Sequence, residues 1–182
     1  MNVCVFCGSA TGRSAIYAEG AAKLGQLLAE SSIQLIYGGG NIGLMGVVAD
    51  AVMRAGGSAT GVIPSFLVDR EVGHRGITHL EVVDSMHQRK QRMADLADAF
   101  VALPGGWGTL EELCEILTWK QLGLIHQPVV LLNSNRFFDP LLEQMRLMTK
   151  EGFLSADTFN LLHVEDTPEH VVTFLTAEKL GG

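Results

Sequence analysis

Residues 99–112 read AFVALPGGWGTLEE and join a short apolar run, a glycine-rich turn and the beginning of a helix. The run 99–103 has the unbroken apolar character of a strand that is covered on both faces of a parallel sheet. The turn holds three glycines, more than a tight turn needs. Glycine lets backbone N–H groups approach a phosphate, and the N-terminus of a helix adds partial positive charge. The stretch therefore predicts a strand, a ligand-binding turn and a helix, in that order.

Strand-like and helix-like segments alternate along the whole chain, which is typical of a parallel sheet wrapped by helices. Strands are predicted at residues 2–7, 33–37, 58–63, 79–83, 99–103, 128–132 and 162–165. Helices are predicted at residues 14–30, 43–55, 86–96, 109–122, 138–151 and 168–177. The chain has no linker, internal repeat or low-complexity tract, so residues 1–182 are expected to form one domain. The predicted fold class is α/β, with a doubly wound, mostly parallel sheet.

Composition and charge narrow the class of partner. Hydrophobic residues make up 47% of the chain and charged residues 18%, as in a compact globular protein. The formal net charge of -7 argues against a nucleic-acid polymer as partner, because such binding needs clustered Lys and Arg. No apolar run reaches the roughly 20 residues of a membrane span, and the N-terminus has a strand pattern rather than a signal peptide. The three cysteines, an odd number, suit a reducing compartment, so a cytoplasmic protein is expected. In CVFC (4–7), the two thiols should point to opposite faces of a strand and be buried in the core.

Two further glycine-rich turns, CGSATGRS (7–14) and YGGGNIGLMG (37–46), also follow predicted strands. Because the carboxyl ends of parallel strands meet at one edge, the three turns are expected to line one anion-binding crevice; tight turns without a ligand are the alternative. The run GGGNIG (38–43) matches the dinucleotide pattern G-x-G-x-x-G. It follows the second strand, however, and no acidic residue stands about 20 positions later to hold a ribose. No glycine-lysine-serine or glycine-lysine-threonine occurs, which excludes a P-loop.

The segment DSMHQRKQRMADLADAF (84–100) places basic residues at a helix start. Ser85 is expected to cap this helix. Arg89 and Lys90 then lie in its first turns, where cations oppose the helix dipole. Such a local misfit indicates function, and a solvated basic face is the alternative.

The helix after the 104–108 turn has two apolar faces when its residues are projected at about 100° per residue. The face expected to pack against the sheet holds Leu110, Leu113, Cys114 and Leu117. The face roughly opposite holds Glu112, Ile116 and Trp119. A partner subunit is expected to bury this second face and to shelter Glu112 from solvent. The adjacent Glu111 and Glu112 have a second interpretation, which is compensation of the helix dipole in the first turn.

The pair SMHQRK (85–90) and PGGWGTLEE (104–112) resembles the signature of the Lonely Guy (LOG) family, P-G-G-x-G-T-x-x-E with an upstream M-H-x-R-K segment. The similarity runs from VCVFCGS (3–9) to LTWKQLGLIHQPVVLLN (117–133) and beyond, so it covers most of the chain. Members are Rossmann-like cytokinin riboside 5'-monophosphate phosphoribohydrolases, and some carry the label lysine decarboxylase. The resemblance implies a Rossmann-like homodimer that cleaves the N-glycosidic bond of a nucleoside 5'-monophosphate.

The resemblance also assigns residues to the site, position by position. It implies that Arg89 and Glu112 are catalytic. It further implies nucleotide contacts from Glu71, Lys90, Gly106, Trp107, Gly108, Thr109, Leu110, Glu111 and Thr118. The cradle for the 5'-phosphate is expected from Gly105, Gly106, Gly108 and Thr109 at the helix N-terminus. The implied reaction needs no metal or redox cofactor, and the histidines lack H-E-x-x-H or cysteine-histidine spacing.

Two other functions use parts of the same pattern. A nucleotide or molybdenum-cofactor carrier would need the glycine turns but no glutamate aimed at the anomeric carbon. A pyridoxal-phosphate decarboxylase needs a Schiff-base lysine and a partner for the pyridinium nitrogen; Lys90 is the only lysine near the expected site, and no such partner is evident. The sequence leaves open whether AMP or a modified cytokinin nucleotide is the substrate, and whether assemblies larger than a dimer form.

Overall fold

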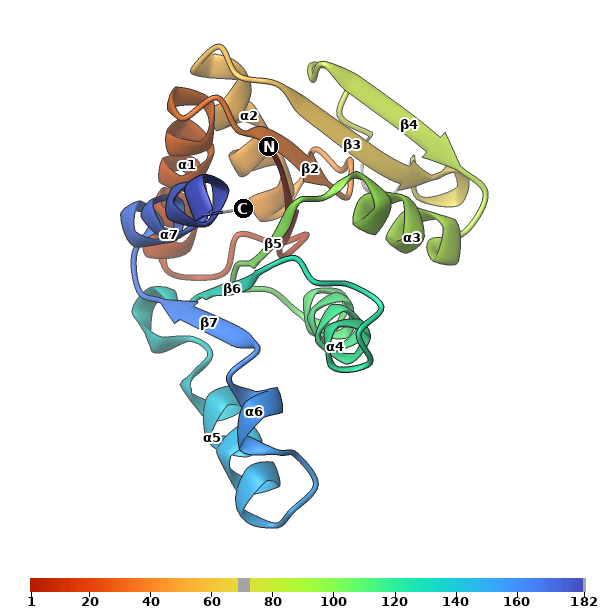
Figure 1. The fold of residues 1–182 in the computed structure, drawn as a ribbon. Coiled ribbons are helices and arrows are strands. Elements are labelled where there is room, and N and C mark those ends of the chain that lie inside the picture. The colour runs from red at the N-terminus through yellow and green to blue at the C-terminus, as the bar shows by residue number, and fades with distance from the viewer. Residues whose placement is uncertain (69–72, 182) are drawn as a thin grey trace.

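A computed structural model describes residues 1–68 and 73–181, and the side chains of residues 178–181 are not included. Its centre is one sheet of seven strands in the order β4-β3-β2-β1-β5-β6-β7, shown in Figure 1. All neighbouring strands run parallel. The strands are β1 (Asn2–Phe6), β2 (Gln34–Tyr37), β3 (Ala59–Pro64), β4 (His79–Val83), β5 (Ala99–Ala102), β6 (Val129–Leu132) and β7 (Leu162–Glu165).

Helices cover both faces of this sheet. The α-helices are α1 (Ala15–Glu30), α2 (Gly43–Arg54), α3 (Met86–Leu96), α4 (Trp107–Gln121), α5 (Asp139–Lys150), α6 (Ala156–Phe159) and α7 (Pro168–Gly181). Short 3₁₀ turns are η1 (Ser65–Leu67) and η2 (Ser134–Arg136). Figure 1 shows α1, α2 and α7 on one side of the sheet and α3 and α4 on the other, while α5 and α6 project beyond its edge. The doubly wound α/β fold predicted from the sequence is confirmed.

The predicted elements match these bounds to within two residues at each end, except that α7 continues further than expected. The turns η1 and η2 and the short helix α6 were not predicted, because segments this short carry no readable hydrophobic period. Edge strands also differ from the expectation of cover on both faces. Val82 on β4 is 55% exposed, since β4 is an edge strand and no further strand of the described residues pairs beyond it.

Two hydrophobic layers lie on opposite faces of the sheet, and alternate side chains of β1 pack into one or the other. Val3, Val5 and Cys7 pack with residues of α1, α2 and α7, whereas Cys4 and Phe6 pack with residues of α3, α4 and α5. Cys4 and Cys7 are both buried and unbridged. The prediction that these two thiols point to opposite faces of a strand, as core residues, is therefore confirmed.

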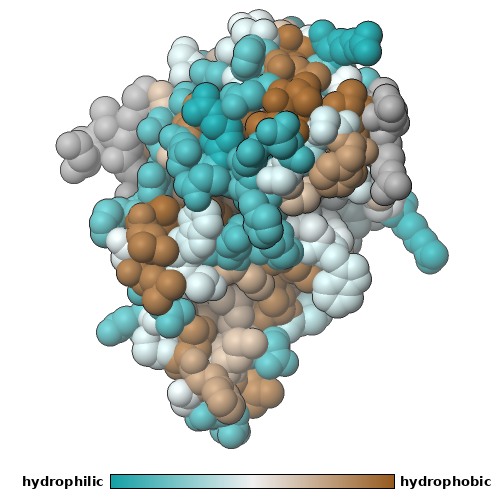
Figure 2. All heavy atoms as spheres, turned by 90° about the vertical axis from the view of Figure 1, so that its right-hand side faces the viewer, coloured by the Kyte–Doolittle hydropathy of each residue, from teal (hydrophilic) through white to brown (hydrophobic). Residues whose placement is uncertain are grey.

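The surface turned toward the viewer in Figure 2 is the right-hand side of Figure 1, where α3, α4 and β4 lie. Hydrophilic side chains occupy the middle of this face, and hydrophobic side chains gather in separate groups, one of them at the lower end, at the height of α5 and α6. Among the residues that the structure describes, no helix combines the length and the apolar character needed to cross a lipid bilayer.

The three glycine-rich turns meet at the carboxyl edge of the sheet, as predicted. Two backbone hydrogen bonds join them: the Gly8 N–H donates to the Pro104 carbonyl at 3.1 Å, and the Leu44 N–H donates to the Gly8 carbonyl at 2.9 Å. Strand β1 pairs with β2 on one side and β5 on the other, and the helices after β1 and β5 cover opposite faces. This is the switch point of a doubly wound sheet, where ligands bind in such folds.

Candidate active site

The N-terminal turn of α4 is open to solvent and has no side-chain cap. Its N-cap residue is Gly106, which supplies no side-chain hydrogen bond. The first N–H groups of a helix have no partner within the helix, so the N–H groups after Gly106 are available to an anion. A Cβ added at Gly106 or Gly108 would meet nothing within 4 Å, whereas one at Gly105 would collide with the side chain of Thr109. Gly105 is therefore fixed by packing within the chain, and Gly106 and Gly108 are not.

The interpretation of Glu111 and Glu112 as compensation of the helix dipole is wrong. Helix α4 begins at Trp107, two residues earlier than predicted, and its first turn contains no acidic residue. Both glutamates thus lie in the second turn, and dipole effects decline sharply beyond the first turn. Their presence needs another physical reason.

The faces of α4 were predicted correctly only in part: Leu110, Leu113 and Leu117 pack against the core layer as expected, but Ile116 and Cys114 do not lie where predicted. Leu113 and Ile116 are 1% and 3% exposed and pack in the same core layer, so Ile116 faces the sheet and not a partner. Cys114, expected in the core, is exposed. Because both stripes of this helix are apolar, a helical projection could not decide which one is buried. The observed rotation turns Glu112 toward the carboxyl edge of the sheet, where its own chain already half-buries it.

The start of α3 is capped as predicted. The Ser85 hydroxyl oxygen accepts the Gln88 N–H at 3.2 Å, and the Gln88 side-chain oxygen accepts the Asp84 N–H at 2.8 Å. Arg89 is only 5% exposed, and its Nη2 donates to the Gly38 carbonyl at 2.7 Å. A solvated basic face is therefore excluded for Arg89. A Cβ at Gly38 would overlap this guanidinium, which explains a glycine at that position.

A cavity of about 220 Å³ lies between these elements. Its polar and charged wall comes from α3, from α4 and from the glycine-rich turn 7–14. The wall brings together the predicted residues Arg89, Gly106, Trp107, Gly108, Thr109, Glu111 and Glu112. The pKa of the Cys4 thiol on β1 is raised, mainly by burial and next by the negative charge of Glu112. The electrostatic effect of Glu112 therefore reaches β1.

Part of the same cavity is apolar, and the sequence did not predict that part. It is lined by Val5, Met45, Leu67 and Met86. Met86 directly follows the helix cap Ser85, and Met45 lies in the first turn of α2, at the end of the glycine-rich stretch 37–46. Their place beside predicted turns was the only signal. Side chains of this type suit a flat apolar ring, since methionine adapts its shape to an aromatic neighbour.

The remaining predicted residues lie in different places. Trp107 is 89% exposed at the cavity, and Gly105 lines a neighbouring cavity of about 220 Å³ together with Tyr17 and Phe137. Leu110 packs partly buried against the core layer of α3 and α4, and Thr118 donates from its hydroxyl to the Cys114 carbonyl at 2.7 Å. Neither Lys90, Leu110 nor Thr118 lines the candidate cavity. Glu71 lies outside the described residues.

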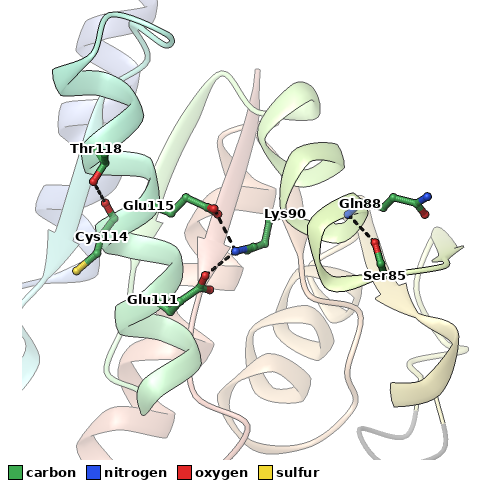
Figure 3. A network of polar contacts seen from close by, with 7 residues as sticks. All are labelled: Ser85, Gln88, Lys90, Glu111, Cys114, Glu115 and Thr118. Atoms are coloured by element: carbon green, nitrogen blue, oxygen red, sulfur yellow. Dashed lines mark hydrogen bonds and ion pairs between the residues drawn. The ribbon is translucent and has the colours of Figure 1, made fainter.

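Lys90 instead bridges the two helices that carry Arg89 and Glu112, as Figure 3 shows. Its Nζ donates to Glu111 at 2.5 Å and to Glu115 at 3.1 Å. Burial lowers the pKa of Lys90, but the hydrogen bonds to both carboxylates outweigh it, so the pKa stands above its ordinary value. A Schiff-base lysine needs the opposite shift, because the neutral amine is the nucleophile. Lys90 is therefore a poor candidate for pyridoxal-phosphate chemistry.

Comparison with protein families and curated relatives gives consistent results. The family model described as "Possible lysine decarboxylase" matches residues 45–175. A cytokinin riboside 5'-monophosphate phosphoribohydrolase from Oryza sativa subsp. japonica is 48% identical over 171 residues, covering 94% of this chain and 71% of that protein. An enzyme of the same name from Rhodococcoides fascians is 49% identical over 158 residues, 86% of this chain and 80% of its own. A third, from Arabidopsis thaliana, is 50% identical over 85% of this chain and 71% of its own.

Solved structures share the fold at lower identity. A molybdenum cofactor binding protein from Rippkaea orientalis superposes with a TM-score of 0.72 at 23% identity, covering 97% of this chain and 94% of that one. The molybdenum cofactor carrier protein of Chlamydomonas reinhardtii gives 0.71 at 21% identity, with 97% and 96% coverage. At such identities the likeness concerns the fold alone.

Proposed function

The chain belongs to the LOG family of cytokinin riboside 5'-monophosphate phosphoribohydrolases, and from this membership we propose that it hydrolyses the N-glycosidic bond of a purine nucleoside 5'-monophosphate. In this reaction the bond between the ribose anomeric carbon and the base nitrogen breaks, and its electron pair leaves with the base. Water supplies the oxygen of the new bond to the anomeric carbon and the proton that the base takes up. The products are the free base and ribose 5-phosphate.

Glu112 is the group that stabilises the transition state. As the glycosidic bond lengthens, the ribose acquires oxocarbenium character and positive charge. A fixed carboxylate stabilises that charge more than it stabilises the neutral sugar, and this difference accelerates the reaction. Glu112 is also suited to orient the attacking water.

Arg89 holds the substrate against Glu112. A guanidinium is always protonated and cannot act as an ordinary base, but it donates strong hydrogen bonds to hydroxyl or phosphate oxygens. The carbonyl of Gly38 holds it in place from the other side at 2.7 Å. The observation that supports the assignment best is that Arg89 and Glu112, from two different helices, line one cavity with the open first turn of α4.

The 5'-phosphate binds at the open first turn of α4, to backbone N–H groups near Gly106, Gly108 and Thr109. These groups and the helix dipole attract an anion. A nucleoside without phosphate loses these charge-assisted hydrogen bonds, so the monophosphate is the preferred substrate. The apolar wall of Met45, Leu67 and Met86 faces the base.

Release of adenine from AMP tests the proposal, with Glu112→Gln as the decisive variant. We expect kcat to fall by about 10²- to 10³-fold, because a preorganised charge near the reacting carbon is lost. The free energy of unfolding in urea should change little. Glu143→Gln, on an exposed ion pair of α5, is the matched control and should match the wild type. Turnover of Glu112→Gln at the wild-type rate removes Glu112 from catalysis.

A carrier function is the alternative outcome of the same assay. A carrier would bind AMP, measurable by calorimetry, and release no adenine. If the protein binds AMP and all of the AMP is recovered intact after prolonged incubation, the result would favour a carrier over a hydrolase.

The working assembly is a homodimer in the cytoplasm. Exposed apolar residues support it: Leu122 and Leu124 after α4 are 65% and 67% exposed, and Phe153 after α5 is 87% exposed. Large apolar side chains exposed in this way suit a surface that a partner covers. None of the three cysteines forms a disulfide within the described residues, which fits a reducing compartment. Light scattering after gel filtration tests the dimer, and a mass of one chain would refute it.

A further inference from the structure

We propose that Lys90 and Glu115 form a bridge between α3 and α4 that positions Arg89 against Glu112, so that both act as positioning residues for the reaction. The inference rests on the proposed function, because it concerns the geometry of the two groups assigned to catalysis. It gives Lys90 a role different from the direct nucleotide contact that the sequence predicted, and it gives Glu115 a role for the first time.

The geometry of the bridge is that of one cation between two anions. Lys90 lies on α3, and Glu111 and Glu115 lie one turn apart on the same side of α4, since residues four apart are neighbours on a helix. Figure 3 shows the ammonium between the two carboxylates, reaching from one helix to the other. The ammonium thus fixes two helices that start from different strands.

The two arms of the bridge differ in exposure. The side chain of Lys90 is 12% exposed, that of Glu115 27% and that of Glu111 53%. Exposed ion pairs are weakened by water and salt, whereas shielded pairs keep more of their attraction. Glu115 is therefore the partner that holds Lys90, although Glu111 lies closer. Loss of Glu115 would leave a shielded ammonium with one solvent-exposed partner.

The bridge is coupled to the site through the chain itself. Lys90 directly follows Arg89, and Glu111 directly precedes Glu112. Adjacent side chains on a helix point about 100° apart, so fixing Lys90 fixes the direction in which Arg89 leaves α3. The same holds on α4 for Glu112. A rotation or shift of about 1 Å in either helix would move the guanidinium relative to the carboxylate, and such shifts can reduce rates by about 10²-fold.

A direct role of Lys90 on the substrate fits the structure less well. Arg89, Glu111 and Glu112 line the cavity, and Lys90 does not. Both carboxylates already occupy the ammonium, which would have to leave them to reach a phosphate. The two roles make different kinetic predictions, because a substrate contact changes KM, whereas misplacement of the catalytic pair lowers kcat.

The experiment measures kcat and KM for adenine release from AMP in Glu115→Gln, Lys90→Met and the double variant. We expect each single variant to lower kcat by about 10-fold with KM within about 2-fold of the wild type. Because both changes break one bridge, the double variant should be no slower than the slower single variant. Lys90→Arg should recover most of the lost kcat.

A second ion pair of α3 serves as the matched control. Arg92 donates to Glu81 of β4 at 2.9 Å, with 44% and 27% of the two side chains exposed. Arg92→Met removes a cation from the same helix without touching the cavity, so its kcat should stay within about 2-fold of the wild type. An equal loss in this variant would mean that any ion pair on α3 matters, which would overturn the specific role of Lys90.

The remaining outcomes separate the alternatives. A raised KM in Lys90→Met with a silent Glu115→Gln would overturn the bridge in favour of a direct substrate contact. If Lys90→Met and Glu115→Gln lower the stability in urea but leave kcat unchanged, the bridge would have a structural role only. Wild-type protein that releases no adenine would refute the proposed function itself. If the wild type is active and Glu115→Gln turns over AMP at the same rate, only the bridge would be refuted.

Discussion

Two glycine-rich turns at the carboxyl edge of the sheet, 38–43 after β2 and 104–108 after β5, look alike in sequence but face different surroundings. In the first, a Cβ at Gly38 would overlap the guanidinium of Arg89, and one at Gly43 would collide with the backbone of Ser9 and Ala10. In the second, a Cβ at Gly106 or Gly108 would meet nothing within 4 Å. The first turn needs glycine for its own packing. The second turn has two glycines at which the described part of the chain leaves room for a larger side chain.

This difference explains why the dinucleotide pattern in 38–43 is misleading. Glycine appears in such motifs where backbone must come close to something, and a sequence does not say to what. At Gly38 the close neighbour is an arginine of the same chain, and at Gly43 it is the neighbouring turn. At Gly106 and Gly108 an added Cβ would meet no described residue within 4 Å, which leaves room for the phosphate that we propose to bind there. We therefore call 38–43 the packing turn and 104–108 the binding turn.

Substitution of Gly43 should have the largest effect on stability. Its φ of +60° lies in the left-handed region, and an added Cβ would press on the backbone of Ser9. We expect Gly43→Ala to lower the free energy of unfolding by about 4 kcal/mol, because backbone atoms cannot move aside as a side chain can. Urea unfolding measures it. A loss below about 1 kcal/mol would contradict the distinction between the two turns.

Substitution of Gly38 should act on Arg89 before it acts on the fold. The added Cβ would displace the far end of a flexible side chain, so we expect a loss of stability of only about 1 to 3 kcal/mol. The guanidinium would leave its place beside the cavity, and kcat/KM for AMP should fall with it. Parallel unfolding and kinetic measurements on Gly38→Ala check both parts. Full activity would show that Arg89 can act from another position.

The fold was largely predictable because its signals are local. The parallel strands are continuous apolar runs, and each helix begins near a recognisable cap or glycine turn, as Ser85 does for α3. The turns η1 and η2 have no side-chain cap, and α6, although Ser155 caps it, is too short to show a hydrophobic period. Burial of β4 was overestimated because sequence alone does not say which strand lies at the edge.

The site was predictable in part. The positions of Arg89 and Glu112 came from a motif, and both line the cavity. The contact between Lys90 and Glu115 could not be predicted from that motif. Whether two charges on separate helices meet depends on how those helices pack, which the sequence does not give. The faces of α4 were assigned only in part for the same reason: Ile116, predicted on the face opposite Leu113, packs in the same core layer, and Cys114 is exposed.

Substitution of Gly108 should separate folding from function. Alanine is favoured over glycine in a helix, so we expect Gly108→Ala to raise the free energy of unfolding by up to about 1 kcal/mol. Its Cβ would stand at the binding turn, where the 5'-phosphate approaches, and KM for AMP should rise by about 10-fold, the equivalent of one charge-assisted hydrogen bond. Adenosine, which lacks the phosphate, is the control substrate, and its kcat/KM should change little. Unchanged KM for AMP in a more stable protein would move the phosphate away from the binding turn.

The smallest effect is expected at Tyr37, the last residue of β2 before the packing turn. Its side chain is fully buried, and its hydroxyl makes no hydrogen bond within the part of the chain that the structure describes. Burial raises the pKa of this hydroxyl, since the charged form is disfavoured there. An unsatisfied buried hydroxyl destabilises a fold, so Tyr37→Phe should raise the free energy of unfolding by up to about 1 kcal/mol.

Urea unfolding of Tyr37→Phe, with Tyr17→Phe at a half-buried tyrosine as control, measures this effect. Turnover of AMP should be unchanged, because Tyr37 does not line the candidate cavity, whereas Gly38 and Arg89 do. A loss of more than about 1 kcal/mol would mean that the hydroxyl has a hydrogen-bond partner, such as a buried water. In that case polar contacts as well as shape would determine the packing turn, and it would resemble the binding turn more than the glycines suggest.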